Sequence, residues 1–444
     1  MRVMLAVHHF PPQYAGGAEQ QAYRTARRLR EWGHEVHVIC VEDIVSGPAD
    51  GISFRDDTYE GLAVRRLSFN LAAAPDPFRW SYDNPWIGQH LREFLPAVAP
   101  DVVHLISGYL MSGSTLQTAV DIGLCTVVTL TDFWFLCPRI NLVRSDGSLC
   151  PGAEDAVACA LCLRKERRRY RLPDQWSGGL AGRALMDLSR WSRDQLVQTV
   201  VQRRAFLLAQ LQRADAIISP SRFLRDMFQS RGVRHSRFYF SRVGLDTDRW
   251  EEGGPVARGP GLRIGYVGQV ARHKGVDVLV EAFLRLRAPQ GQSPPQLVMY
   301  GSAEQFPTFV RQLRQRVVGR NDVLFAGRFD HAQIRRIHAG LDVLVVPSIW
   351  YENSPAVILE AFACGTPVVV SGLGGMAELV GDGVNGFHFP VGNVSELACV
   401  LQRFVDEPGL RAVLQPGMPA VKTDREEVTE LLDIYHHVCA RKPA

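Results

Sequence analysis

The sequence predicts two α/β domains, each built around a parallel β-sheet with helices on both faces. The chain has 444 residues, which is too long for a single hydrophobic core. A short apolar run, a glycine-bearing turn and a helix follow one another at residues 2–31, and the same order returns from residue 262. A stretch rich in glycine and proline, Glu251–Gly261, separates the two patterns and marks the domain boundary.

The composition is that of an ordinary globular protein. Apolar residues make up 46% of the chain and charged residues 22%, and the formal net charge is +4. No segment approaches 18 uninterrupted apolar residues, and the N-terminal apolar run turns polar after a few positions. We therefore expect neither a membrane span nor a signal peptide, and a cytoplasmic location.

The first domain is predicted from short apolar runs, which indicate strands, and from periodic runs, which indicate helices. Between them lies a polar region, residues 42–84, whose pattern defines no element. The expected strands are Arg2–Val7, Val36–Val41, Pro100–Ile106, Cys125–Leu130, Ala216–Ser219 and Phe238–Val243, and the expected helices include Ala18–Glu31, Gln195–Gln212 and one that starts at Ser221.

Polar groups follow these strands at their carboxyl ends, where an open parallel sheet binds its ligands. Gly16 and Gly17 stand at the first strand–helix junction, where the absence of a side chain lets the backbone approach a ligand closely. His104 lies near the end of one strand, and Thr131 and Asp132 follow the next. A lone histidine at such a position is more often structural than catalytic.

Four cysteines fall within 26 residues of a loop-rich segment. The last two form a Cys-x-x-Cys pair, and four thiolates are the ligands of a tetrahedral zinc ion or an iron–sulfur cluster. The gaps of twelve and eight residues match no standard zinc finger, so redox chemistry and coincidence remain alternatives. We expect a structural metal site in an insertion at about residues 133–193, formed by Cys137, Cys150, Cys159 and Cys162.

A basic stretch runs from Leu163 to Arg193, with nine Arg or Lys residues against three acidic ones, a local charge of +6. Basic helical surface suits anionic lipid or a phosphorylated acceptor, and Trp176 and Trp191 would suit an interface. The alternative is an arginine-rich helix that is simply solvated. The first interpretation predicts peripheral contact with the inner face of an anionic membrane. We expect no nucleic-acid partner.

The second domain repeats the order of strand, glycine and helix. Gly301 directly follows a strand, which places backbone near a ligand. The expected strands are Leu262–Val267, Gln296–Tyr300, Val323–Phe325, Val343–Val346 and Pro367–Val370, and the expected helices start at Val276 and Pro355 and include Ser395–Val405 and Glu426–Cys439.

The segment Pro347–Pro367 joins a buried strand to a helix that Ser354 can cap and Pro355 can open. The free N–H groups and the positive end of the helix dipole attract phosphate at the carboxyl edge of a parallel sheet. Two acidic residues bracket this turn, Glu352 just before the helix and Glu360 about two turns into it. Taken alone, they could be two solvated glutamates on a surface helix.

These two glutamates, with seven residues between them and followed by Ala361, Cys364, Gly365 and a strand, closely resemble the donor-binding motif of one enzyme family. It comprises retaining glycosyltransferases of the glycogen synthase and phosphatidylinositol mannosyltransferase type. The resemblance extends in order over nearly the whole chain. It implies the GT-B fold, in which two Rossmann-like domains face each other across a cleft and the C-terminal one binds a nucleotide-sugar. The domains would be residues 1–245 and 262–405, with residues 406–444 returning to the first domain.

The same resemblance implies roles for individual residues. Lys274 matches the family's phosphate-binding lysine, and a departing diphosphate needs such a cation as the glycosidic bond breaks. Glu352 would address the sugar ring, and Glu360 would accept from the ribose hydroxyls. The implied donor site also includes Gly16, Gly17, Arg272, Gly301, Asn353, Ser354, Pro355 and Ala356, and the implied catalytic set is Glu352, Asp132 and His104.

Two positions depart from the family pattern. The family has a histidine where this chain has Thr131, and often an arginine where it has Gln269. At the first position the family's role does not carry over to threonine, and Asp132 is the nearer candidate for an acceptor contact or a base. At the second, either Arg272 substitutes or one positive charge is missing.

The sequence therefore predicts a retaining glycosyltransferase that moves a hexose from a nucleotide-sugar to a saccharide or lipid-linked acceptor. Family members of this type commonly build surface polysaccharides or glycolipids. The resemblance implies no metal or other cofactor for catalysis. The alternatives are a GT-B nucleotide-sugar epimerase and a non-catalytic protein that binds sugar nucleotides.

Overall fold

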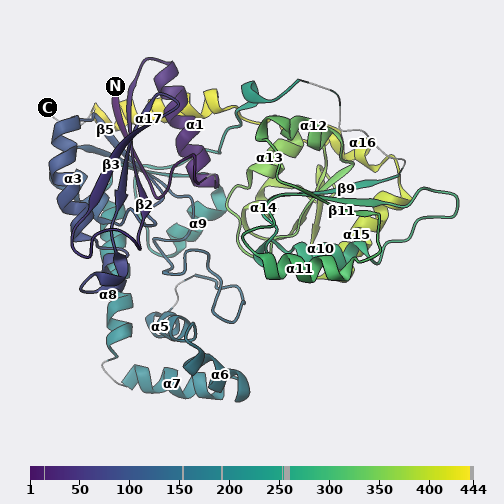
Figure 1. Ribbon diagram of the computed structural model, residues 1–444, viewed down its shortest axis with the longest axis horizontal. Coiled ribbons are helices and arrows are strands. Elements are labelled where there is room, and N and C mark those ends of the chain that lie inside the picture. The colour runs from purple at the N-terminus through teal and green to yellow at the C-terminus, as the bar shows by residue number, and fades with distance from the viewer. Residues whose placement is uncertain (15, 153–154, 192–193, 253, 255–260, 441–444) are drawn as a thin grey trace. The chain divides into compact units, whose positions relative to one another are not determined.

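The computed structural model describes the chain except residues 15, 153–154, 192–193, 253, 255–260 and 441–444 (Figure 1). Most of the predicted domain boundary, residues 253 and 255–260, thus lies outside the described residues. The chain divides into two compact units, each built on a largely parallel sheet. This confirms the predicted α/β class with two Rossmann-like domains. The first unit comprises Met1–Pro220, Leu224–Ser241 and Glu427–Ala444, and the second comprises Ser221–Phe223 and Arg242–Glu426.

Within the described residues, the sheet of the first unit has eight strands in the order β3-β4-β2-β1-β5-β6-β7-β8. Neighbouring strands run parallel except β3 and β4. The bounds are β1 (Arg2–Val7), β2 (Glu35–Asp43), β3 (Ser53–Tyr59), β4 (Leu62–Ser68), β5 (Val102–Ile106), β6 (Cys125–Thr129), β7 (Ala216–Ser219) and β8 (Phe238–Phe240).

The polar region at residues 42–84 is better ordered than its sequence indicates. It contains the antiparallel pair β3–β4, joined by a tight turn in which Glu60 and Gly61 both have positive φ. Strand β3 is the edge of the sheet and leaves most of its residues exposed, so it needs no apolar alternation. For this reason the hydrophobic pattern alone does not reveal it.

Helices cover both faces of this sheet (Figure 1). The C-terminal helix contributes Val428, Leu431 and Tyr435 to the same hydrophobic core as Val3 and Leu5 of β1. Helices α5 to α7 form the insertion between β6 and β7. The bounds are α1 (Gly17–Glu31), α2 (Pro77–Trp80), α3 (Pro85–Val98), α4 (Ser114–Asp121), α5 (Ala156–Arg164), α6 (Arg168–Trp176), α7 (Leu180–Trp191), α8 (Gln195–Arg213), α9 (Arg222–Ser230) and α17 (Asp424–Cys439).

The second unit has a parallel sheet whose described strands follow the order β11-β10-β9-β12-β13-β14. The order reverses between β9 and β12, and ligands of such sheets bind at this point. The strands are β9 (Arg263–Val267), β10 (Gln296–Tyr300), β11 (Val323–Gly327), β12 (Val343–Val346), β13 (Val368–Ser371) and β14 (Gly386–Phe389). The helices are α10 (Val276–Phe283), α11 (Pro307–Arg316), α12 (Ile334–Ala339), α13 (Ala356–Ala363), α14 (Gly374–Leu379), α15 (Val394–Asp406) and α16 (Leu410–Leu414).

Candidate active site

The loops that follow β9 and β12 bring Lys274 and Glu352 together at the reversal point of the second sheet. The Lys274 ammonium donates to Glu352 Oε1 over 2.6 Å. Ser348 Oγ and Trp350 Nε1 donate to the same oxygen, each over 2.8 Å. The predicted lysine and the first predicted glutamate are therefore direct partners. The sequence reasoning missed Ser348 and Trp350, although both lie within four residues of Glu352.

Glu352 carries its charge in a largely buried place. Its side chain is 11% exposed, and that of Lys274 is 25% exposed. Burial pushes the pKa of Glu352 up, but the attraction of Lys274 and the three hydrogen bonds outweigh burial, so the pKa lies below its ordinary value. The carboxylate is thus ionised at neutral pH. The ammonium also lies 5.1 Å from the centre of the Trp350 ring, a distance at which cation–π attraction operates.

Two glycines make this geometry possible. Gly275 has a φ of 67°, and a Cβ there would lie 1.9 Å from the carbonyl oxygen of Pro347. A Cβ on Gly375, in the first turn of α14, would lie 1.7 Å from the carbonyl oxygen of Asn353. Only glycine permits such close backbone contact. The loop that carries Glu352 is therefore held between the loop of Lys274 and the start of α14.

The residue at the N-cap of α13 differs from the predicted one. The helix begins at Ala356 with Pro355 as its N-cap, and no side chain in the described part of the chain caps it. Ser354 was predicted as the cap, but its Oγ is buried without a hydrogen-bond partner among the described residues, so that prediction is wrong. The physical reason is that Pro355 keeps an extended ψ of 115° and so moves the boundary one residue along. An uncapped helix start of this kind attracts anions.

Glu360 lies on α13 in a histidine environment. Its side chain is 7% exposed, its Oε1 is 2.8 Å from His331 Nε2, and its Oε2 is 3.8 Å from His338 Nε2. Burial raises its pKa, but the two histidines more than compensate and bring the pKa to about 2. His331 is 59% exposed and lies after β11, where the sequence reasoning identified no partner for Glu360.

The remaining predicted donor residues of the second unit lie in the neighbouring loops. Arg272 is 63% exposed, approaches Asp277 at 3.4 Å and stacks on Phe309. The partners of Arg272, Asp277 and Phe309, are thus other residues than Lys274 and Glu352. Gly301 follows β10, and its backbone packs directly against the backbone of Gly268, which follows β9.

In the first unit, Asp132 lies beyond the end of β6. It accepts from Ser107 Oγ at 3.0 Å and from the backbone N–H of Trp134 at 2.8 Å. Burial raises its pKa above the ordinary value, although these hydrogen bonds and the nearby His8 act in the other direction. The carboxyl group therefore holds a proton more readily than an exposed aspartate does.

The loop between β1 and α1 adds a second polar pair that sequence reasoning missed. His8 Nε2 lies 3.3 Å from Glu19 Oε1, and both side chains are at most 14% exposed. A Cβ on Gly16 would lie 2.6 Å from the Glu19 carboxylate, whereas Gly17 has open space around it. The position of His8, directly after the first strand, was the available signal.

His104 belongs to the core rather than to a surface that a substrate can reach. It is 2% exposed, and its two ring nitrogens hydrogen-bond to Tyr435 Oη at 2.6 Å and to Thr129 Oγ1 at 2.7 Å. Burial lowers its pKa to about 3. The histidine connects β5 to β6 and α17. The predicted catalytic role of His104 therefore has no support in this environment.

Comparisons with known proteins show the family of this chain. The family model described as a glycosyl transferase 4-like domain matches residues 16–240, and the model for glycosyl transferases group 1 matches residues 255–417. The chain belongs to the glycosyl transferase 4-like family. This glycosyltransferase is 24% identical to a glycogen synthase of Mycobacterium tuberculosis, over 92% of this chain and 87% of that one. It is 31% identical to an alpha-maltose-1-phosphate synthase of the same organism, over 59% and 73% of the two chains.

Solved structures confirm that the glycosyltransferase has the GT-B fold. Anabaena HepE in complex with UDP and glucose superposes with a TM-score of 0.64 at 17% identity, over 98% of each chain. The sucrose-phosphate synthase of Thermosynechococcus elongatus superposes with a TM-score of 0.62 at 19% identity, over 98% of this chain and 97% of that one.

The four clustered cysteines of the glycosyltransferase line one cavity of about 60 Å³ beside α5. They are free thiols. Burial and the proximity of the other three raise the pKa of Cys159 to about 12. Across the described part of the chain, however, no three His, Cys, Asp or Glu side chains are arranged to hold a metal ion. The structure brings the predicted ligands together without forming a metal-binding group.

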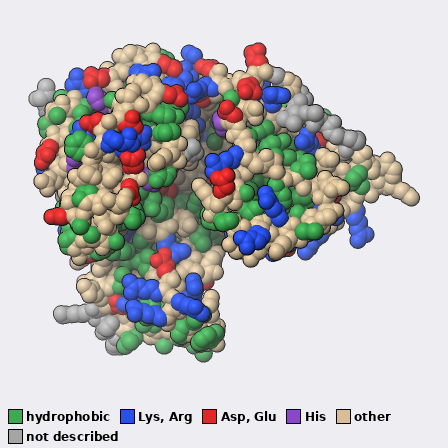
Figure 2. All heavy atoms as spheres, viewed as in Figure 1, with side chains coloured by type: hydrophobic (Ala, Val, Ile, Leu, Met, Phe, Trp, Pro, Cys, Tyr) green, Lys and Arg blue, Asp and Glu red, His purple; other side chains and the backbone are tan. Residues whose placement is uncertain are grey.

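The basic insertion exposes apolar side chains as well as cations. Trp176 is 80% exposed, and Leu180 and Leu188 are each 65% exposed. Figure 2 shows Lys and Arg side chains gathered over the α5–α7 segment with hydrophobic side chains around them. Among the described helices, none is long and apolar enough to cross a membrane.

Proposed function

We propose that this glycosyltransferase moves a hexose from a nucleotide-sugar to a saccharide or lipid-linked acceptor, with retention of configuration and without a catalytic metal. The observation that supports this most is the Lys274–Glu352 pair beside the uncapped start of α13. A cation, free helix N–H groups and a carboxylate at one sheet reversal match the phosphate and sugar ends of one ligand.

In this proposal the donor diphosphate binds at Lys274 and at the N-terminus of α13. Ser354 supplies a further donor, because its buried hydroxyl lacks a hydrogen-bond partner among the described residues. Glu352 accepts from hydroxyls of the sugar, and Glu360 accepts from the ribose while His331 holds it in place. The UDP and ADP in two structural relatives, HepE and starch synthase IV, agree with a nucleoside diphosphate at this site.

In the reaction step one bond to the anomeric carbon forms, another breaks, and one proton is transferred. The acceptor oxygen attacks the anomeric carbon on the face from which the diphosphate departs, and the C–O bond electrons go to the phosphate oxygen. That oxygen then takes the hydroxyl proton, so no strong protein base is needed. Lys274 stabilises the charge that develops on the diphosphate. On the acceptor side we assign hydrogen bonding of the incoming hydroxyl to Asp132, and close approach of the reacting ligands to the backbone of Gly17, which has open space around it.

Labelled UDP-, ADP- and GDP-sugars, incubated with saccharide and lipid-linked acceptors in the presence of EDTA, test this proposal. We expect transfer from one of these donors, and NMR should show the same anomeric configuration in donor and product. An inverted product would refute retention, and full loss of turnover in EDTA would refute metal independence. Release of an epimerised sugar, or nucleotide binding without any turnover, would support the epimerase or the non-catalytic alternative.

We also propose that the acceptor is presented at an anionic membrane by the α6–α7 segment. Trp176, Leu180 and Leu188 are exposed beside the arginine-rich surface, which suits insertion at the level of lipid headgroups. Sedimentation with phosphatidylglycerol vesicles at low salt tests it, with phosphatidylcholine vesicles as the control. The Trp176→Ser and Leu180→Ser double variant should lose binding. Equal sedimentation of this variant, or no sedimentation of the unmodified protein, would contradict the assignment.

The cysteine cavity is our candidate for a structural zinc ion or iron–sulfur cluster, because four cysteines line it. Elemental analysis of the purified protein should find about one equivalent of zinc, or iron with matching sulfide. The Cys159→Ser and Cys162→Ser double variant should lose the metal, whereas Cys399→Ser, at an exposed position, should keep it. Metal-free unmodified protein with four reactive thiols would overturn this assignment.

A further inference from the structure

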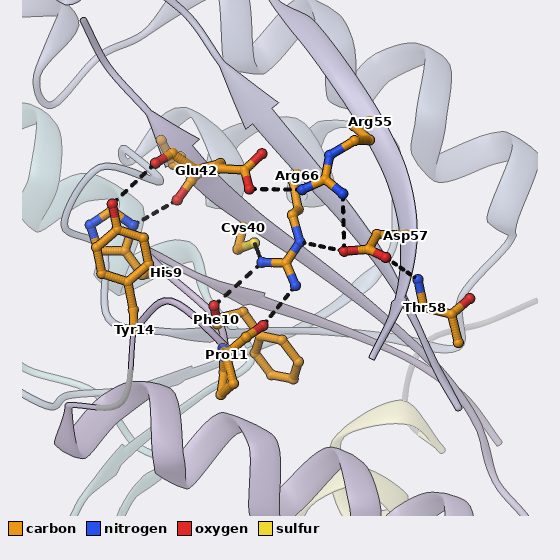
Figure 3. Close-up of polar contacts among 11 residues, drawn as sticks. His9, Phe10, Pro11, Tyr14, Cys40, Glu42, Arg55, Asp57, Thr58 and Arg66 are labelled. Carbon is orange, nitrogen blue, oxygen red and sulfur yellow. Dashed lines mark hydrogen bonds and ion pairs between the residues drawn. The ribbon is translucent and has the colours of Figure 1, made fainter. Parts of the chain in front are cut away.

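Arg66 is a buried arginine that holds the loop between β1 and α1. It lies on β4 and is 4% exposed. Its guanidinium donates to the carbonyl oxygen of Pro11 at 2.7 Å and to that of Phe10 at 3.3 Å, as Figure 3 shows. One side chain thus satisfies two consecutive backbone carbonyls of a loop that lies two strands away in the sheet.

Arg66 is itself paired with a carboxylate on β3, which is linked through Arg55 to a carboxylate on β2. Its Nε donates to Asp57 at 3.0 Å. Arg55 contacts the same Asp57 oxygen at 3.3 Å and Glu42 at 2.8 Å (Figure 3). Two cations and two anions therefore alternate, so the buried guanidinium has a charged partner. A planar arginine fixed on one edge presents its other N–H groups in a defined direction.

The rest of the loop is attached to the end of β2. His9 Nδ1 lies 2.7 Å from the carbonyl oxygen of Val41, and Tyr14 stacks on the His9 ring at 3.8 Å. Tyr14 also donates to the carbonyl oxygen of Glu42 at 3.3 Å. These contacts come from side chains of the loop, whereas Arg66 supports its backbone from outside (Figure 3).

We infer that Arg66 is a positioning residue for glycosyl transfer. It fixes the backbone at Phe10–Pro11 and thereby places His8 before the fixed point and Gly16–Gly17 after it. The inference rests on the proposed function, in which this loop contacts the reacting ligands. A displacement of about 1 Å at a reacting group costs up to ~100-fold in rate. Arg66 is therefore expected to affect turnover without touching a substrate.

The test compares Arg66→Met with Arg65→Met. Arg65 is the neighbouring residue on the same strand and forms a bidentate pair with Asp56, with both distances 2.7 Å, but forms no hydrogen bond with a described residue of the loop. Each variant therefore loses one arginine and the ion pair that this arginine forms with an aspartate. We expect Arg66→Met to lower kcat of transfer at least tenfold relative to Arg65→Met, at temperatures where circular dichroism shows equal folding. The affinity for UDP or ADP alone should change less than threefold.

Hydrogen exchange supplies a readout that does not need activity. Peptides covering residues 8–17 should exchange at least fivefold faster in Arg66→Met than in Arg65→Met. Arg66→Lys keeps the charge but not the fork, so it should fall between Arg66→Met and the unmodified protein in both measurements. If Arg66→Met does not fold, Arg66→Lys decides by the same criteria. Unchanged loop exchange, or kcat within twofold of the control, would overturn the inference. Absence of transfer by the unmodified protein would instead refute the proposed function, and loop exchange would still test Arg66.

Discussion

Replacing Lys274 by methionine removes the cation of the candidate site and keeps most of its apolar stem. Glu352, which is 11% exposed in the unmodified protein, then keeps Ser348 and Trp350 as its donors. Removing one partner of a buried ion pair typically costs about 3–5 kcal/mol. Two hydrogen bonds survive, and Lys274 is 25% exposed, so water reaches its place and offsets part of the loss. We therefore expect the second unit to lose about 2 kcal/mol of unfolding free energy at pH 7.

Thermal unfolding monitored by circular dichroism measures this loss. For a unit of this size, about 2 kcal/mol corresponds to a decrease of roughly 4–8 °C in the Tm of its transition. Arg316→Met is the matched control, because it breaks an ion pair with Glu281 in which both side chains are more than 40% exposed. Such an exposed pair contributes only about 0–1 kcal/mol. Under the proposed function, Lys274→Met should also lower kcat of transfer by about 10²–10³-fold.

The pH dependence of the stability loss in Lys274→Met tests whether the loss comes from the charge on Glu352. The folded-state pKa of Glu352 lies below its ordinary value, so its charged form stabilises the fold above the unfolded-state pKa near 4.5. That contribution disappears as the pH falls through the folded-state pKa. The difference in stability between the unmodified protein and Lys274→Met should therefore be largest near pH 7 and shrink under acid. A constant difference, or a Tm equal to that of the Arg316→Met control, would refute the reasoning.

Three further predictions concern single residues. Glu360→Gln should remove about 3 kcal/mol of stabilisation, which the unmodified protein has above pH 4.5 and loses between pH 4.5 and about 2. Urea unfolding of both proteins at pH 7 and pH 3 measures this difference. Equal pH dependence in the two proteins would contradict the prediction. Gly375→Ala should disturb the loop of Glu352 and lower both Tm and transfer, whereas Gly409→Ala, with open space around it and negative φ, should leave both unchanged. His104→Ala should lower unfolding free energy by about 2 kcal/mol without changing kcat at temperatures where the protein is folded; a large loss of kcat would restore a catalytic role.

The hydrophobic pattern was sufficient for most of the fold, because buried strands must be apolar on both faces of a parallel sheet. Strands such as Val343–Val346 and Gln296–Tyr300 have the predicted bounds. The pattern failed where burial does not constrain the residues. Strand β3 is an exposed edge, so the region that contains it and Arg66 reads as irregular. The partner of that arginine in the loop is 55 residues away along the chain, which no local pattern encodes.

The residues of the candidate site divide in the same way. The sequence pointed to the lysine, the two glutamates and the glycines mainly because their order resembles the donor-binding motif of one family. Only the tertiary structure showed that Lys274 bonds directly to Glu352, that Glu360 lies between histidines, and that His104 is enclosed in the core. These facts depend on which strand ends are adjacent in the sheet and on which faces are covered. Side-chain partners and burial are set by contacts between segments distant in sequence, and those contacts determine charge and reactivity.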